Sequence, residues 1–260
     1  MNTNINAYIF PATGPSFIGQ SHDQYMPPPD EKCWLIGGSA GAYRALNIFY
    51  DLPAESMIDG MCDITWYPWR FQSSLTAMML QLQGHCIDST NLKKIDTPSN
   101  HIPVIMVTRT YYSPWIILVI CVICSFLGIY DMIYRLAELQ IYVPQWADVS
   151  KFPLEFDDIM KYRFVPLTSS NVSDVLYDSS RLPFLSLSRS NNNLCDAGIL
   201  FYHHNGRVRD GFKTMLLGSG KTNQMCRTFT DFRPIDTTNL QKNIAMTIKK
   251  YLFTPLMINT

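Results

Sequence analysis

The chain has 260 residues, of which 47% are hydrophobic and 16% charged, and its formal net charge is zero. This length suffices for one large domain with a sizeable core. A neutral chain lacks the basic surface that nucleic-acid binding needs, so we expect no nucleic-acid partner. Residues 1–6 contain neither a basic nor an apolar stretch, which predicts that there is no signal peptide and that the protein is cytoplasmic, either free or attached peripherally to a membrane.

The seven cysteines are scattered and show no metal-binding spacing. Cys121 and Cys124 have the Cys-x-x-Cys spacing, but they lie inside an apolar run rather than in a loop. We therefore expect buried, reduced thiols and no metal site.

The first predicted element is a buried strand over residues 7–10. It leads into residues 11–19, a loop rich in proline, glycine and serine. Such a loop can present backbone N–H groups to an anion, or it can be a simple turn. Since Pro15 has no N–H, Gly14 and Ser16 are its better donors.

The central motif lies at residues 37–41, which read Gly-Gly-Ser-Ala-Gly. An apolar, strand-like run precedes it, and residues 42–49 carry apolar side chains at helical spacing. Gly-x-Ser-x-Gly between a strand and a helix is typical of a nucleophile elbow, in which a strained turn holds the serine hydroxyl out at a helix N-terminus. The alternative is an ordinary turn of small residues. The elbow makes Ser39 the candidate nucleophile.

The middle of the chain predicts a helix over residues 73–82, a strand over residues 101–108 and an apolar segment over residues 115–130. The apolar segment is slightly short of a membrane span. It has three interpretations: a buried helix, a helix lying in a membrane interface, or a true span. A true span would place Ser39 and any later catalytic residue on opposite sides of a membrane. We interpret residues 110–160 as a hydrophobic cap or insertion.

Farther along, residues 162–167 predict a strand and residues 171–177 a short helix. Asp196 then lies inside an apolar, strand-like run. A buried acid is costly unless something pairs with it or uses it, so Asp196 is either a functional carboxylate or a structural one that accepts local backbone N–H groups. The alternation of strand and helix signals predicts an α/β fold. Residues 207–260 are expected to form an extension, packed on the domain or facing a membrane.

Four features, in this order, resemble the patatin-like phospholipase family and in particular its bacterial members. They are the strand with its glycine-containing loop, the motif at residues 37–41, residues 178–183 (similar to Ala-Ser-x-x-x-Pro) and the Asp-Ala-Gly at residues 196–198. The resemblance covers residues 7–204. In the oxyanion loop, Thr-Gly-Pro-Ser at residues 13–16 replaces the family's Gly-Gly-Gly-x-Arg/Lys-Gly.

This resemblance implies a three-layer α/β/α fold with a central, mostly parallel sheet over residues 1–206. It implies a lipid acyl hydrolase that cleaves phospholipids or other acyl esters, at a membrane surface, without metal or cofactor. Ser39 is then the nucleophile and Asp196 its general base. The oxyanion hole is assigned to Thr13, Gly14, Ser16 and Ala40, and the remaining motif residues are Gly37, Gly41, Ala197 and Gly198.

Two alternatives stay open. An α/β-hydrolase with a Ser-His-Asp triad also uses Gly-x-Ser-x-Gly, but few strands precede Ser39, and His203 and His204 follow Asp196 closely. A catalytically degenerate hydrolase could instead serve as a membrane-associated interaction protein.

Overall fold

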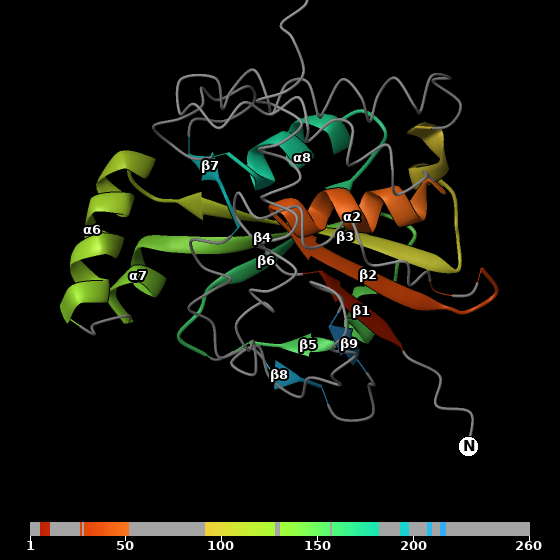
Figure 1. Ribbon diagram of the computed structural model, residues 1–260, viewed down its shortest axis with the longest axis horizontal. Coiled ribbons are helices and arrows are strands. Elements are labelled where there is room, and N and C mark those ends of the chain that lie inside the picture. The colour runs from red at the N-terminus through yellow and green to blue at the C-terminus, as the bar shows by residue number, and fades with distance from the viewer. Residues whose placement is uncertain are drawn as a thin grey trace, which may run out of the picture.

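The computed structural model describes residues 6–10, 27, 29–51, 92–127, 131–156, 158–181, 193–197, 207–209 and 214–216. Its centre is a mixed, mostly parallel sheet with the strand order β6-β4-β3-β2-β1-β9, to which β7 adds by pairing with β3 (Figure 1). The α/β class predicted from the sequence is thereby confirmed.

The helices and strands have the following bounds. The main sheet consists of β1 (Ala7–Phe10), β2 (Cys33–Gly38), β3 (His101–Thr110), β4 (Ala137–Pro144), β6 (Tyr162–Leu167), β7 (Leu194–Cys195) and β9 (Thr214–Leu216). A second, antiparallel sheet pairs β5 (Leu154–Glu155) with β8 (Arg207–Val208). The helices are α2 (Ala40–Phe49), α6 (Pro114–Leu127), α7 (Asp131–Leu136) and α8 (Val172–Ser179), with short 3₁₀ turns η3 (Lys93–Asp96) and η4 (Val149–Lys151).

Alternating side chains of the strands enter two cores on opposite faces of the sheet. Leu35 of β2 belongs to a cluster with α2 and α8, whereas its neighbour Ile36 belongs to a cluster with α6, α7 and Leu154. Strands buried on both faces read as continuous apolar runs, which is why β1, β2 and β3 could be predicted. The strand at residues 162–167 and the helices after residues 39 and 171 are also confirmed. The helix predicted at residues 73–82 lies outside the described residues.

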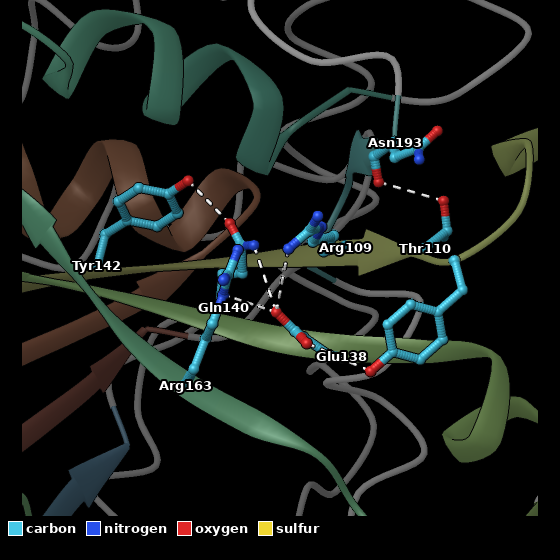
Figure 2. Close-up of polar contacts among 8 residues, drawn as sticks. Arg109, Thr110, Glu138, Gln140, Tyr142, Arg163 and Asn193 are labelled. Atoms are coloured by element: carbon cyan, nitrogen blue, oxygen red, sulfur yellow. Dashed lines mark hydrogen bonds and ion pairs between the residues drawn. The ribbon is translucent and has the colours of Figure 1, made fainter.

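The interpretation of residues 110–160 as a cap or insertion is wrong for β4. This strand lies inside the sheet between β3 and β6. Its polar side chains share one face, where Glu138 forms ion pairs with Arg163 (2.7 Å) and Arg109 (3.8 Å), and the Gln140 amide is hydrogen-bonded to the Tyr142 hydroxyl (Figure 2). These polar residues alternate with the buried Leu139 and Ile141, so the period-two pattern of a strand is present in the sequence and the prediction overlooked it.

The apolar segment is helix α6, and only part of it is buried. Ile117 and Cys124 belong to the core, whereas Ile116, Val119, Ile123 and Leu127 are half exposed or more. The first of the three interpretations, a buried helix, therefore holds only for the side of α6 that carries Ile117 and Cys124. The thiols of Cys33, Cys124 and Cys195, the cysteines whose side chains the structure describes, are buried, as expected.

In the parts of the chain that the structure describes, none of the helices combines the length and apolar character that crossing a membrane requires.

The segment after residue 206 contributes to both sheets. Residues of β8 pair with β5, and β9 pairs in parallel with β1 at the edge of the main sheet. This part of the expected extension is therefore built into the fold.

Candidate active site

The predicted elbow is present at the end of β2. Gly38 pairs with Met106 of β3, Ser39 follows, and α2 begins at Ala40. Ser39 has φ 53° and ψ −127°, a backbone conformation that residues with a side chain rarely adopt. Strain of this kind persists only where the surroundings enforce it, and it is concentrated at functional sites.

Glycine is required at both positions before Ser39, because neighbouring atoms approach them closely. A Cβ at Gly37 would overlap the carbonyl group of Gly41 in the first turn of α2. A Cβ at Gly38 would lie 2.8 Å from the Cβ of Ala197. The need for glycine at position 37 follows from the elbow motif, but the need at position 38 depends on a residue that lies far away in the sequence.

Strands β2 and β7 both pair with the same side of β3, and this arrangement brings Asp196 to the elbow. Parallel β2 pairs with residues 101–106 of this edge, and antiparallel β7 pairs with residues 108–109. The two strands therefore run toward each other along one edge. The residues that follow them, Ser39 and Asp196, come together where the strands meet.

Ser39 and Asp196 are in direct contact. The Ser39 hydroxyl donates a hydrogen bond to Oδ2 of Asp196 at 2.7 Å, although the two residues are 157 positions apart. Both are buried, with exposed fractions of 3% and 8%. A carboxylate in this position can accept the hydroxyl proton, which is what an otherwise weak serine nucleophile needs.

Ser179, the last residue of α8, holds the backbone of the elbow. Its hydroxyl accepts a hydrogen bond from the Ser39 N–H at 2.9 Å and donates one to the Met106 carbonyl at 2.7 Å. Ser179 lies in the segment at residues 178–183 that resembles Ala-Ser-x-x-x-Pro, but no role was predicted for it. Its position shows that it ties the elbow to β3.

The same end of α8 also holds the backbone around Asp196. The N–H of Asp196 donates to the Arg181 carbonyl at 2.8 Å, and the N–H of Ala197 donates to the Ser179 carbonyl at 3.1 Å. Residues 179–181 thus position the nucleophile candidate and the acid together.

The remaining predicted site residues divide into two groups. Ala40 opens α2, so its N–H is one of the first four of a helix, which have no acceptor within the helix and lie at the positive end of the helix dipole. The Ser39 N–H is already engaged by Ser179. The other predicted residues, Thr13, Gly14, Ser16 and Gly198, and the alternative bases His203 and His204 lie outside the described residues.

Within the described ranges, no group of three or more His, Cys, Asp or Glu side chains is arranged to hold a metal ion. Comparisons of the chain with protein-family models, curated proteins and solved structures gave no match.

Proposed function

We propose that this protein is a serine acyl hydrolase of the patatin-like type, which cleaves acyl esters of phospholipids or related lipids through a Ser39–Asp196 dyad. The observation that carries the proposal is the 2.7 Å hydrogen bond from a serine hydroxyl on a strained elbow to a buried carboxylate. A serine and a base in direct contact, at a helix N-terminus, form the arrangement that acyl transfer requires.

The reaction would proceed in two steps. Ser39 Oγ attacks the ester carbonyl carbon while Asp196 accepts the hydroxyl proton, and the tetrahedral intermediate expels the alcohol, which takes that proton from Asp196. Water then attacks the acyl-serine, again giving a proton to Asp196, and the fatty acid leaves as Ser39 recovers its hydrogen. The backbone N–H of Ala40 would stabilise the developing oxyanion, together with donors from the loop that contains Thr13, Gly14 and Ser16. Each such donor is typically worth about 2.7–4 kcal/mol.

The direct contact favours a dyad over a Ser-His-Asp triad. In a triad, an imidazole lies between the serine and the acid. Here the Ser39 hydroxyl donates to Asp196 itself. We further propose the three-layer patatin-like arrangement for residues 1–206, which the packing of α2 and α8 against one face and of α6 and α7 against the other supports.

The test is hydrolysis of a soluble short-chain ester and of phospholipid vesicles by the wild type, Ser39→Ala and Asp196→Asn. Both substitutions should lower kcat by about 10³-fold or more, as loss of a nucleophile or its base does in serine hydrolases. Ser180→Ala is the matched control, because the buried Ser180 hydroxyl has no hydrogen-bond partner among the described residues.

Two results would overturn the proposal. If replacing His203 and His204 abolished activity, the triad would be correct. If the wild type were inert on every ester, the non-catalytic alternative, an interaction protein on the same scaffold, would be favoured.

A further inference from the structure

Three cations gather on the face of the sheet that α2 and α8 cover. Side chains alternate between the two faces of a strand, so Arg109 shares the face of Val107, which packs in the cluster with α2 and α8. Arg163 shares that face with Val165 of β6, and Lys161 comes two residues before Arg163. The side chains of Arg109 and Arg163 are 35% and 50% exposed, and Lys161 is exposed as well. We call Arg109, Lys161 and Arg163 the cationic cluster.

The carboxylate of Glu138 lies within this cluster, and both of its oxygens are engaged by groups other than Arg109. Nε of Arg163 lies 2.7 Å from Oε1, and the Tyr111 hydroxyl donates a hydrogen bond to Oε2 at 3.2 Å. The ammonium group of Lys161 lies 5.4 Å above the Tyr111 ring. Arg109 reaches Glu138 only at 3.8 Å, which is too long for a hydrogen bond, and among the described residues this is its one ion pair (Figure 2). The guanidinium of Arg109, with its five N–H donors, is therefore a surplus cation.

The other acid near the cluster is Asp178 of α8. Burial raises the pKa of the Tyr142 hydroxyl, the Asp178 carboxylate adds to the rise, and the two arginines of the cluster oppose it. Asp178 is completely buried, whereas the arginines are partly exposed. An anion that approaches from solvent would therefore meet the arginines first.

Arg109 lies beside the candidate active site. In the sheet it is directly opposite Glu138 on one side and directly opposite Leu194 of β7 on the other. Asp196 follows Leu194 by two residues, and residues at such a diagonal are about 7–8 Å apart, within reach of a long side chain. Asp196 in turn accepts the hydrogen bond of the Ser39 hydroxyl. The Arg109 guanidinium can therefore contact a molecule whose reacting atom lies at Ser39.

We infer that Arg109 binds the phosphate group of a glycerophospholipid substrate while Ser39 attacks the nearest ester of that lipid. The planar guanidinium can donate two parallel hydrogen bonds to phosphate oxygens, and Arg163 and Lys161 add positive charge beside it. Only a few covalent bonds separate the phosphorus of a glycerophospholipid from its nearest ester carbonyl, which suits the short separation of Arg109 from the dyad. The inference rests on the proposed function for the cleavage of the ester. It adds a substrate class, since glycerophospholipids should be preferred over neutral acylglycerols.

The experiment compares two soluble substrates that carry the same esters, dibutanoylglycerol phosphate and dibutanoylglycerol. The measured quantity is the phosphate preference, defined as the ratio of kcat/KM for the first substrate to kcat/KM for the second. The full chain is compared with Arg109→Gln and Arg109→Lys. Arg135→Gln is the matched control, because Arg135 is also an exposed arginine but lies in α7, which packs on the opposite face of the sheet. Melting temperatures check that all variants fold.

We expect the wild type and Arg135→Gln to show a phosphate preference of about tenfold or more, and Arg109→Gln to lose it with the charged hydrogen bonds to phosphate. Arg109→Lys should keep part of the preference, because it retains the charge but not the planar fork. Two results would overturn the inference. One is a wild type without preference. The other is an equal fall in kcat/KM for both substrates in Arg109→Gln, which would mean that Arg109 acts on the dyad instead of on phosphate.

Inorganic phosphate distinguishes a lipid phosphate from a free one. It should compete with dibutanoylglycerol phosphate for the wild type. If it bound in a manner that requires Arg109 to a protein with no preference between the two esters, the site would hold free phosphate and the inference would fail.

Calorimetric binding of dibutanoylglycerol phosphate to Ser39→Ala and to Ser39→Ala/Arg109→Gln separates the inference from the proposed function. The double variant should bind about tenfold more weakly. If this difference is found although the wild type cleaves neither substrate, the phosphate site stands and the proposed function fails. If both esters are cleaved but the two variants bind equally, the proposed function stands and the phosphate site fails.

Discussion

The backbone N–H of Ser39 donates its hydrogen bond to the side chain of Ser179, at 2.9 Å. The donor lies on the strained elbow and the acceptor at the end of α8, 140 residues later. Ser179 in turn donates to Met106, so its hydroxyl connects α8, the elbow and β3. This contact fixes the position of the Ser39 backbone and hence the direction in which its side chain extends. Ser179 is therefore a positioning residue, not a reacting one.

Ser179→Ala should reduce both stability and turnover. The substitution leaves a buried N–H without its acceptor, which typically costs about 1–3 kcal/mol of unfolding free energy. Because Ser39 loses a constraint on its orientation, kcat should fall about tenfold with little change in KM. The rate at which a fluorophosphonate labels Ser39 should fall in parallel.

Ser180→Ala is the control for this experiment, since it removes a neighbouring buried hydroxyl that has no hydrogen-bond partner among the described residues. If Ser179→Ala melted at a lower temperature but reacted with the fluorophosphonate at the wild-type rate, Ser179 would be structural only.

The close approach of Gly38 to Ala197 allows a rescue experiment. In Gly38→Ala the new Cβ would lie 2.8 Å from the Cβ of Ala197, and a methyl group has no flexible end that could move aside. The backbone next to Asp196 must therefore shift, and hydrolysis should fall by tenfold or more. Ala197→Gly removes the opposing atom, so the double variant should recover most of the activity. Failure of this rescue, with Ala197→Gly alone fully active, would contradict the coupling.

Local patterns in the sequence were enough to predict much of this fold. Continuous apolar runs predicted β1, β2 and β3, and the elbow motif predicted the turn at Ser39 and the helix after it. The pairing of Ser39 with Asp196 came from resemblance and from the cost of a buried acid, and the structure brings the two side chains together.

What could not be predicted depends on which distant segments meet. The alternation in β4 predicts a strand, but nothing near Glu138 in the sequence shows that Arg109 and Arg163 pair with it. The requirement for glycine at position 38 and the role of Ser179 likewise follow from tertiary contacts, with Ala197 and with Ser39. The family-like segment at residues 178–183 was the one sequence signal that pointed to Ser179.

The strain at Ser39 can be measured by comparing two inactive variants. Ser39→Ala and Ser39→Gly both lack the hydroxyl, so they differ only in the Cβ that a positive φ disfavours. Such a conformation costs about 1–3 kcal/mol for a residue with a side chain. Glycine avoids this strain, but it loses roughly 0.5–1 kcal/mol more than alanine on folding, because its unfolded chain has more conformational freedom. Denaturant unfolding should therefore show Ser39→Gly to be about 1 kcal/mol more stable. Equal stability would mean that the elbow stores no strain at this residue.

Cys33 predicts a loss of stability at alkaline pH. Burial raises the pKa of its thiol from 9.0 to about 12, and the Glu31 carboxylate adds to the shift. Above pH 9 the thiol ionises in the unfolded chain but stays protonated in the folded protein, so rising pH stabilises only the unfolded state. The contribution of Cys33 to the free energy of unfolding is complete below pH 9. It should fall by about 1.4 kcal/mol per pH unit as the pH rises toward 12.

Cys33→Ala isolates this effect from the other groups that titrate at alkaline pH. The measurement is denaturant unfolding of the wild type and the variant at a series of pH values between 9 and 12. The stability difference between the two proteins should shrink as the pH rises, because only the wild type carries the thiol. A difference that stays constant across this range would show that the Cys33 thiol ionises as readily in the folded protein as in the unfolded chain.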